Sequence, residues 1–127
     1  MIDMSVKDMT DQQLNRELAE LMGFTVGKSH HNNFHYLIGN GVVISSPKWT
    51  ESAAWEEIPN YCNDPAASLE VQAKALEIDT DTYIRHLGAL ICDRAADHYN
   101  NKSIAKLLNA PPRQRAEAAY MTLSKQD

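Results

Sequence analysis

The sequence predicts an α+β fold, in which a small antiparallel sheet is layered with about four helices. Three observations support this prediction. A capped amphipathic helix lies near the start of the chain. Two β-prone runs then flank Gly39-Asn40-Gly41, and apolar residues recur at helical spacing over most of the second half. Because no repeat, low-complexity stretch or linker divides the chain, we expect a single α+β domain over residues 1–127.

The first helix is predicted over residues 11–22. Thr10 and Gln13 stand at the positions of a capping box, in which each side chain accepts a hydrogen bond from the backbone N–H of the other. Leucines recur on one face of this segment. Gly23 follows, where a left-handed C-cap residue is typical.

A β-hairpin is predicted next. Its strands are expected over Phe34–Ile38 and Val42–Ile44, because Asn40-Gly41 between them favours a tight hairpin turn. Residues 45–63 contain two prolines and three large aromatic residues. They indicate a looped segment with one short strand near Ala54–Ile58.

Asp64-Pro65 predicts the start of a second helix, with an aspartate as N-cap and a proline in the first turn. Its buried face is predicted at Leu69, Ala73 and Leu76.

Three further helical segments are expected. A 3.6-residue apolar period predicts a helix over residues 80–97, with an alternating strand over Thr82–Ile91 as the competing interpretation. Ser103–Leu108 has the pattern of a short helical turn. Pro111-Pro112 predicts the start of a last helix, which reaches Ser124.

Charge and hydropathy disfavour two classes of function. The net charge is −5, and non-specific nucleic-acid binding requires a basic surface. No apolar run approaches the roughly 20 residues of a membrane span, and the N-terminus lacks the pattern of a signal peptide. We therefore expect a cytoplasmic protein without a membrane partner, for which nucleic acid is a disfavoured ligand.

The charge is unevenly distributed along the chain. Residues 1–98 contain seven basic and fifteen acidic side chains, a net charge of −8, whereas residues 99–127 contain five and two, a net charge of +3. The basic end indicates an ordinary mixed surface, an anion site or a contact between subunits.

No catalytic motif is present, neither a GxSxG elbow nor an HExxH helix nor a P-loop. Asp93, Asp97 and His98 are interpreted as surface residues of the third helix, with acid–base catalysis as the alternative. Cys62 and Cys92 are expected to be free thiols in a reducing compartment. The sequence thus predicts a protein that is not an enzyme and needs no cofactor.

A histidine cluster, His30, His31 and His35, does not predict a metal site. On a strand, His31 and His35 would share a face but stand about 13 Å apart, whereas zinc needs ligands about 2 Å from the ion. These residues are interpreted as solvent-facing, or as part of a ligand pocket.

Aromatic residues and two arginines complete the candidate site. The rings between residues 36 and 61 belong either to the core or to a platform for a nucleobase or a partner protein. The arginines stand in the first turn of the last helix, where backbone N–H groups and guanidinium groups can bind an anion, or where they form ordinary surface ion pairs. The candidate ligand-binding residues are His31, His35, Tyr36, Trp49, Trp55, Tyr61, Arg113 and Arg115.

Three segments resemble small phage accessory proteins of the ABA-sandwich and NinX-like type. They are Thr10–Gly23 with its Met22-Gly23-Phe24 step, Pro59–Ala67, and Ala110–Ala119. The resemblance implies a three-layer fold, with an antiparallel sheet between helices, encoded by a bacteriophage or prophage. It supplies no catalytic residues, and the helical pattern of Asp79–His98 departs from the further strand that such proteins often carry.

Together these observations predict a non-catalytic phage accessory protein in the host cytoplasm. It would bind and sequester a small anionic molecule, of the nucleotide-derived, host-defence signalling kind, in a site of the type that often forms between the subunits of a homo-oligomer. The alternative is a protein–protein inhibitor or adaptor that acts on a host protein. A concave, half-polar pocket would favour the ligand, and a flat exposed patch would favour the partner.

Overall fold

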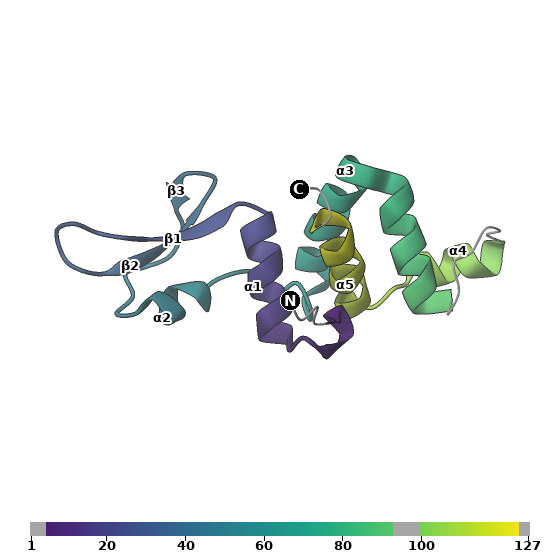
Figure 1. The fold of residues 1–127 in the computed structure, drawn as a ribbon, viewed down its shortest axis with the longest axis horizontal. Coiled ribbons are helices and arrows are strands. Elements are labelled where there is room, and N and C mark those ends of the chain that lie inside the picture. The colour runs from purple at the N-terminus through teal and green to yellow at the C-terminus, as the bar shows by residue number, and fades with distance from the viewer. Residues whose placement is uncertain (1–4, 93–99, 125–127) are drawn as a thin grey trace.

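The computed structural model describes residues 5–92 and 100–124 of the chain, and its helices outnumber its strands (Figure 1). The helices are the 3₁₀ turn η1 (Val6–Asp8), α1 (Asp11–Leu21), α2 (Glu51–Trp55), α3 (Pro65–Cys92), α4 (Asn101–Leu108) and α5 (Pro112–Leu123). The strands are β1 (Phe24–Lys28), β2 (His35–Gly39) and β3 (Val42–Val43), which form one antiparallel sheet in the order β1-β2-β3. The predicted α+β class is confirmed.

The sheet and α2 lie at one end of the molecule, α3 and α4 lie at the other, and α1 and α5 are between them (Figure 1). Among the described residues, α2 packs against β1 and β2, and α1 contacts β1. The resemblance implied a sheet between two helical layers. The structure instead places the sheet beyond α1, away from α3 and α4 (Figure 1).

The predicted capping box of α1 is confirmed. The Thr10 backbone N–H donates to Gln13 Oε1 at 2.8 Å, and the Gln13 backbone N–H donates to Thr10 Oγ1 at 3.1 Å. Gly23 has a φ of 99°, which is the left-handed conformation expected after the helix.

The predicted hairpin between β2 and β3 is also confirmed. Asn40 and Gly41 have φ angles of 53° and 79°, as a tight hairpin turn requires. β1 was not predicted from the sequence, because Gly27 interrupts its β-prone pattern. A Cβ at Gly27 would lie 2.7 Å from Ile38 Cδ1, the flexible end of a side chain on the paired strand, which would then have to shift.

The strand predicted near Ala54–Ile58 is wrong, since this part of the chain contains α2. Thr50 caps the helix by accepting a hydrogen bond from the Ala53 backbone N–H at 3.1 Å. Leu37 of β2 and Ala54 of α2 are both completely buried. The short helix thus covers the sheet where a further strand was expected.

α3 starts at Pro65 as predicted, with Asp64 Oδ1 accepting from the Ala66 backbone N–H. The helix is broken at Asp79, whose φ of −157° and ψ of 87° are not helical. The carboxylate of Asp79 accepts hydrogen bonds from the backbone N–H and the hydroxyl of Thr82, at 3.1 and 2.7 Å. Asp79 therefore caps a second helical half, which confirms the predicted helix from residue 80 as far as Cys92.

The buried face predicted for the first half of α3 is wrong in part. Leu69 and Ala73 are exposed. The buried residues on this half are small, and they face the alanine-rich α5, with which α3 is in extensive contact. Small side chains on both helices allow the two axes to approach closely. The small buried residues include Ala67, Ser68, Val71 and Ala75 of α3, and Ala116, Ala118 and Ala119 of α5.

The last two predicted helices are present as α4 and α5. Asn100 caps α4 by accepting a hydrogen bond from the Ser103 backbone N–H at 2.9 Å. α5 also packs against α1 and η1, so it forms the centre of the helical part. The candidate residues Asp93, Asp97 and His98 lie outside the described residues.

We expect Asp79→Ala to lower the thermal stability of the protein. Hydrogen bonds from Thr82 hold the pKa of Asp79 below its ordinary value of 3.8. The stabilisation is therefore present above pH 3.8 and is lost as the pH falls through the lower pKa of the folded state. Melting curves followed by circular dichroism between pH 2 and 7 test this. Asp81→Ala, which removes an exposed carboxylate two residues away, is the control. Equal effects of the two substitutions would contradict the capping role.

Candidate functional site

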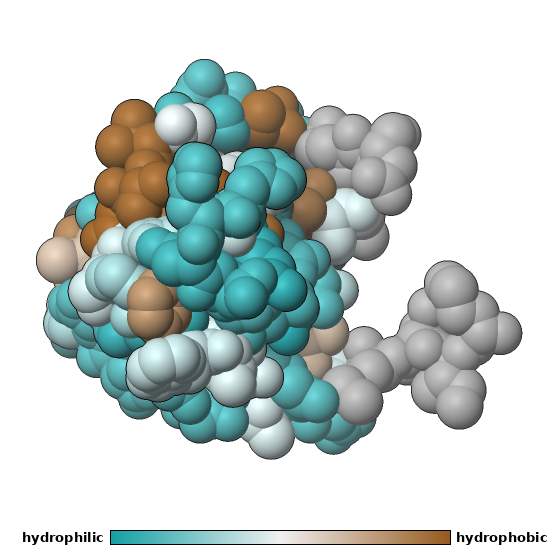
Figure 2. Space-filling view, turned by 90° about the vertical axis from the view of Figure 1, so that its left-hand side faces the viewer, coloured by the Kyte–Doolittle hydropathy of each residue, from teal (hydrophilic) through white to brown (hydrophobic). Residues whose placement is uncertain are grey.

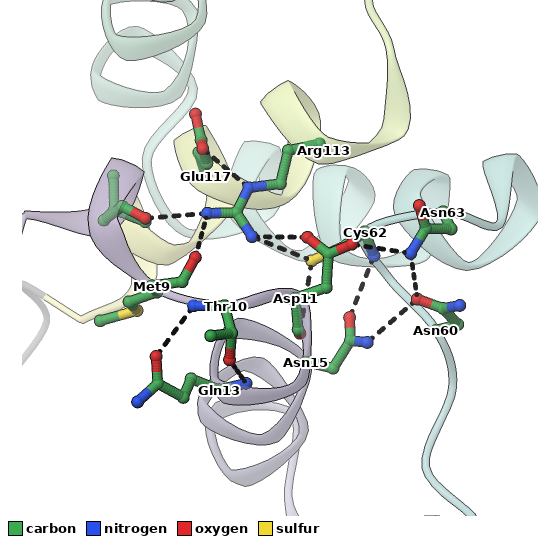
Figure 3. Close-up of polar contacts among 11 residues, drawn as sticks. Met9, Thr10, Asp11, Gln13, Asn15, Asn60, Cys62, Asn63, Arg113 and Glu117 are labelled. Atoms are coloured by element: carbon green, nitrogen blue, oxygen red, sulfur yellow. Dashed lines mark hydrogen bonds and ion pairs between the residues drawn. The ribbon is translucent and has the colours of Figure 1, made fainter.

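Arg113 at the start of α5 is held by a network of polar contacts within the protein (Figure 3). Its Nε donates to Glu117 Oε2 and its Nη1 to Asp11 Oδ1, both at 2.8 Å. Its Nη2 donates to the backbone carbonyls of Val6 and Met9, at 3.0 and 2.8 Å. The fifth N–H of the guanidinium points at the sulfur of Cys62, with a nitrogen–sulfur distance of 3.8 Å.

All five donors of Arg113 are thus used inside the protein. Burial alone would lower the pKa of Arg113, but the hydrogen bond to Glu117 and the neighbouring acidic groups raise it above its ordinary value. The interpretation of Arg113 as an anion-binding residue is therefore corrected: its guanidinium has no donor left for a ligand.

Cys62 belongs to the same network and is a free, buried cysteine. Its backbone N–H donates to Asn15 Oδ1 at 3.0 Å. Burial raises the pKa of the Cys62 thiol to about 11, although Arg113 partly opposes the effect. The thiol is protonated at neutral pH, so it lacks the thiolate character of a nucleophile.

The candidate aromatic residues do not form one platform. Tyr61 is completely buried in the helical core, so its ring cannot reach a ligand. Trp49 is 81% exposed and meets the Phe34 ring edge-on at a centroid distance of 4.7 Å. Tyr36 lies in β2, and its hydroxyl oxygen accepts a hydrogen bond from Asn32 Nδ2 at 3.3 Å.

The candidate histidines are also separated. His31 lies in the turn between β1 and β2, not on a strand, and is exposed. His35 lies in β2, where its backbone pairs with that of Lys48. Over residues 5–92 and 100–124, no three His, Cys, Asp or Glu side chains gather at a spacing that suits a metal ion.

Trp55 lines a groove of about 440 Å³ between α1 and α2. The Arg16 guanidinium carbon lies 4.6 Å from the centre of the Trp55 ring, and Arg16 Nε also forms an ion pair with Glu20 at 3.3 Å. The other lining residues are mostly polar and include Glu56. Arg16 already has two partners, Trp55 and Glu20, and Glu56 adds a second carboxylate. This groove is therefore a poor anion site.

Arg115 lines a second groove, of about 260 Å³, between α3 and α4. Its walls are mainly aliphatic, and they come from both halves of α3 and from the end of α4. The aliphatic lining residues are Leu69, Leu76, Ile84, Leu87, Leu107 and Leu108. Tyr83 and Gln72 also line the groove, and the Tyr83 hydroxyl donates a hydrogen bond to Gln72 Oε1 at 2.9 Å.

Arg115 has no anionic partner among the described residues. Its Nη2 donates to the Leu108 carbonyl at 3.1 Å, and its Nη1 makes a long contact of 3.5 Å with Ser68 Oγ. Its Nε is buried and has no acceptor in the part of the chain that the structure describes. None of the ion pairs between described residues includes Arg115. Burial raises the pKa of Tyr83, and the charge of Arg115 partly opposes this, so that charge acts inside the groove.

The structure thus separates the eight candidate residues. Trp55 and Arg115 line grooves, although not the same one. The sequence analysis did not assign Gln72, Tyr83 or the leucines of α4 to a site. The available signal in the sequence was the adjacent pair Leu107-Leu108 at the end of the predicted helical turn.

Comparison with known proteins yields no relative: no protein-family model, no curated protein and no solved structure matches the chain. The resemblance of residues 10–23, 59–67 and 110–119 to phage accessory proteins therefore stays a prediction. Every helix in residues 5–92 and 100–124 is too short or too polar to cross a lipid bilayer.

We expect Arg113→Met to destabilise the fold by about 3 kcal/mol, because it leaves the 9%-exposed carboxylate of Glu117 without its partner. A loss of this size lowers the melting temperature by roughly 10 °C in a chain of this length. Adding Glu117→Leu should recover part of the loss, since an apolar pair can replace a buried ion pair.

Thermal unfolding of both variants, beside the exposed control Lys7→Ala, measures these effects. An unchanged melting temperature for Arg113→Met would show that the network does not stabilise the fold.

Proposed function

We propose that this protein is a non-catalytic binding protein for a small anionic molecule, which it holds at Arg115 in the groove between α3 and α4. One observation carries this proposal: the guanidinium of Arg115 borders an aliphatic groove, its Nε is buried without an acceptor, and no carboxylate pairs with it among the described residues. An anion in the groove would give this guanidinium an ionised acceptor.

The energetics favour an anion at this position. A partly buried charge without a partner is costly, and a hydrogen bond between charged groups contributes about 1.5–3 kcal/mol. The guanidinium fork matches the two oxygens of a carboxylate or phosphate group. Arg113, two residues earlier, shows the contrast, since all its donors already have partners in the protein.

A narrower part of the proposal concerns the chemical class of the ligand and the phage origin of the protein. Sequestration of a nucleotide-derived defence signal by a phage protein in the host cytoplasm is supported by the resemblance of three segments to phage proteins. The groove adds Arg115 as a subsite for a phosphate.

The proposed function predicts that the purified protein retains an anion. The protein is mixed with nucleotides, phosphate monoesters and aliphatic carboxylates, filtered, and denatured by heat, and both fractions are analysed by mass spectrometry. A compound that is depleted from the filtrate and released intact supports a non-catalytic binding protein. Arg115→Gln should weaken its binding roughly 10- to 100-fold.

Arg16→Gln is the matched control, because it removes the arginine of the other groove. Binding that survives Arg115→Gln but not Arg16→Gln would move the site to the groove between α1 and α2. Release of a compound with a new mass would show catalysis and overturn the non-catalytic proposal.

The second candidate function is binding of a partner protein by the edge of the sheet. Val42, Val43 and Ile44 follow one another along the outer edge and are 53–61% exposed, and Trp49 lies further along the same edge. Apolar atoms gather in the upper part of this end of the molecule (Figure 2). Exposed apolar strands at a sheet edge are sites of pairing with another chain.

The charge of this end supports the second candidate. Residues 21–50 contain two lysines and three histidines but no aspartate or glutamate, although the whole chain has a net charge of −5. An acidic partner surface would complement this end.

For the second candidate, we expect Val43→Lys combined with Trp49→Ser to abolish capture of any partner from a bacterial lysate. Both side chains are exposed, so the melting temperature should change little. Leu108→Ser, at the other end of the molecule, should leave the capture intact. A protein captured equally by all three forms would not use the sheet edge.

A further inference from the structure

The polar groups of the groove between α3 and α4 limit what its ligand can be. Of the three polar residues in its lining, Gln72 and Tyr83 form a hydrogen bond to each other. Arg115 is the third, and its Nε lacks an acceptor among the described residues. That hydrogen bond uses the Gln72 side-chain carbonyl and the Tyr83 O–H, Arg115 is the cationic residue of the lining, and the remaining lining residues are aliphatic.

The apolar groups of the groove define the rest of the ligand. Leu69 is 46% exposed and Leu108 is 75% exposed, so both lining residues present apolar surface that a ligand could bury. A base or a ribose in this position would bury several donors and acceptors against leucine side chains, which is unfavourable. An aliphatic chain would lose no hydrogen bond there.

We propose that the ligand is an unbranched aliphatic carboxylate, bound as a free monomer, with its carboxylate at Arg115 and its chain along the leucines of the groove. This inference rests on the proposed function. The volume of about 260 Å³ suits a short chain. At about 30 Å³ for a group the size of a water molecule, it accommodates roughly nine such groups, the carboxylate included.

Titration calorimetry with hexanoate, octanoate and decanoate, each below its micelle concentration, tests the ligand class. Burial of each methylene group should raise the affinity about fourfold. Octan-1-ol has the same chain without the charge, and it should bind roughly 10- to 100-fold more weakly than octanoate.

Two variants assign the two parts of the ligand to their residues. Arg115→Gln should make octanoate bind no better than octan-1-ol. Leu108→Ser removes an exposed side chain, so the fold should be kept, and the gain in affinity with chain length should become smaller. If Arg115→Gln does not fold, the comparison of octanoate with octan-1-ol on the natural protein still decides the role of the charge.

The outcomes separate this inference from the proposed function. If adenosine monophosphate or a cyclic dinucleotide binds through Arg115 and the carboxylates do not, the ligand class is wrong and the proposed function stands. If none of these anions binds, both fail. Equal binding of octanoate and octan-1-ol would overturn the placement of the carboxylate. Binding only to decanoate incorporated in phosphatidylcholine vesicles would overturn the free monomer as the ligand.

Discussion

The helical part of the structure depends on the guanidinium of Arg113. It joins α5 to Asp11 at the start of α1, to the carbonyls of η1 and the turn after it, and to Cys62 before α3. Asp11 and Arg113 are 102 residues apart in the sequence. One side chain from the end of the chain therefore fixes the beginning, and α1 in turn carries the sheet. The loop that this contact closes is costly in entropy, so the contact must be stabilised by the packing around it.

The parts of the fold that could be predicted from the sequence are those that local chemistry determines. The capping box at Thr10, the turn at Asn40-Gly41 and the proline at the start of α3 need only a few neighbouring residues. The strand predicted near Ala54–Ile58 failed because Thr50 caps a helix there, and the alanines and glutamates of this stretch also favour helix. The exposed position of Leu69 could not be predicted, because the packing of α3 on α5 decides which stripe is buried.

The candidate site shows the same limit. Arg113 and Arg115 were treated together because they lie in the same helical turn, but residues two apart on a helix point in different directions. Arg113 faces the N-terminal segment and Arg115 faces the groove. Composition identified the arginines, but only the tertiary arrangement shows which of them has a buried donor without an acceptor among residues 5–92 and 100–124. The aromatic residues behave similarly, since Tyr61 is in the core and Trp49 is on the surface.

The two walls of the groove differ in how firmly they are held. Val71, Tyr83 and Leu87 anchor α3 in the core, whereas α4 buries none of its side chains. Detachment of α4 should therefore cost much less than global unfolding, and its amide hydrogens should exchange with solvent through this local opening. When a ligand contacts both walls, part of its binding free energy stabilises α4 in its docked position. Ligand affinity and the local stability of α4 are then thermodynamically linked, so a change in one changes the other.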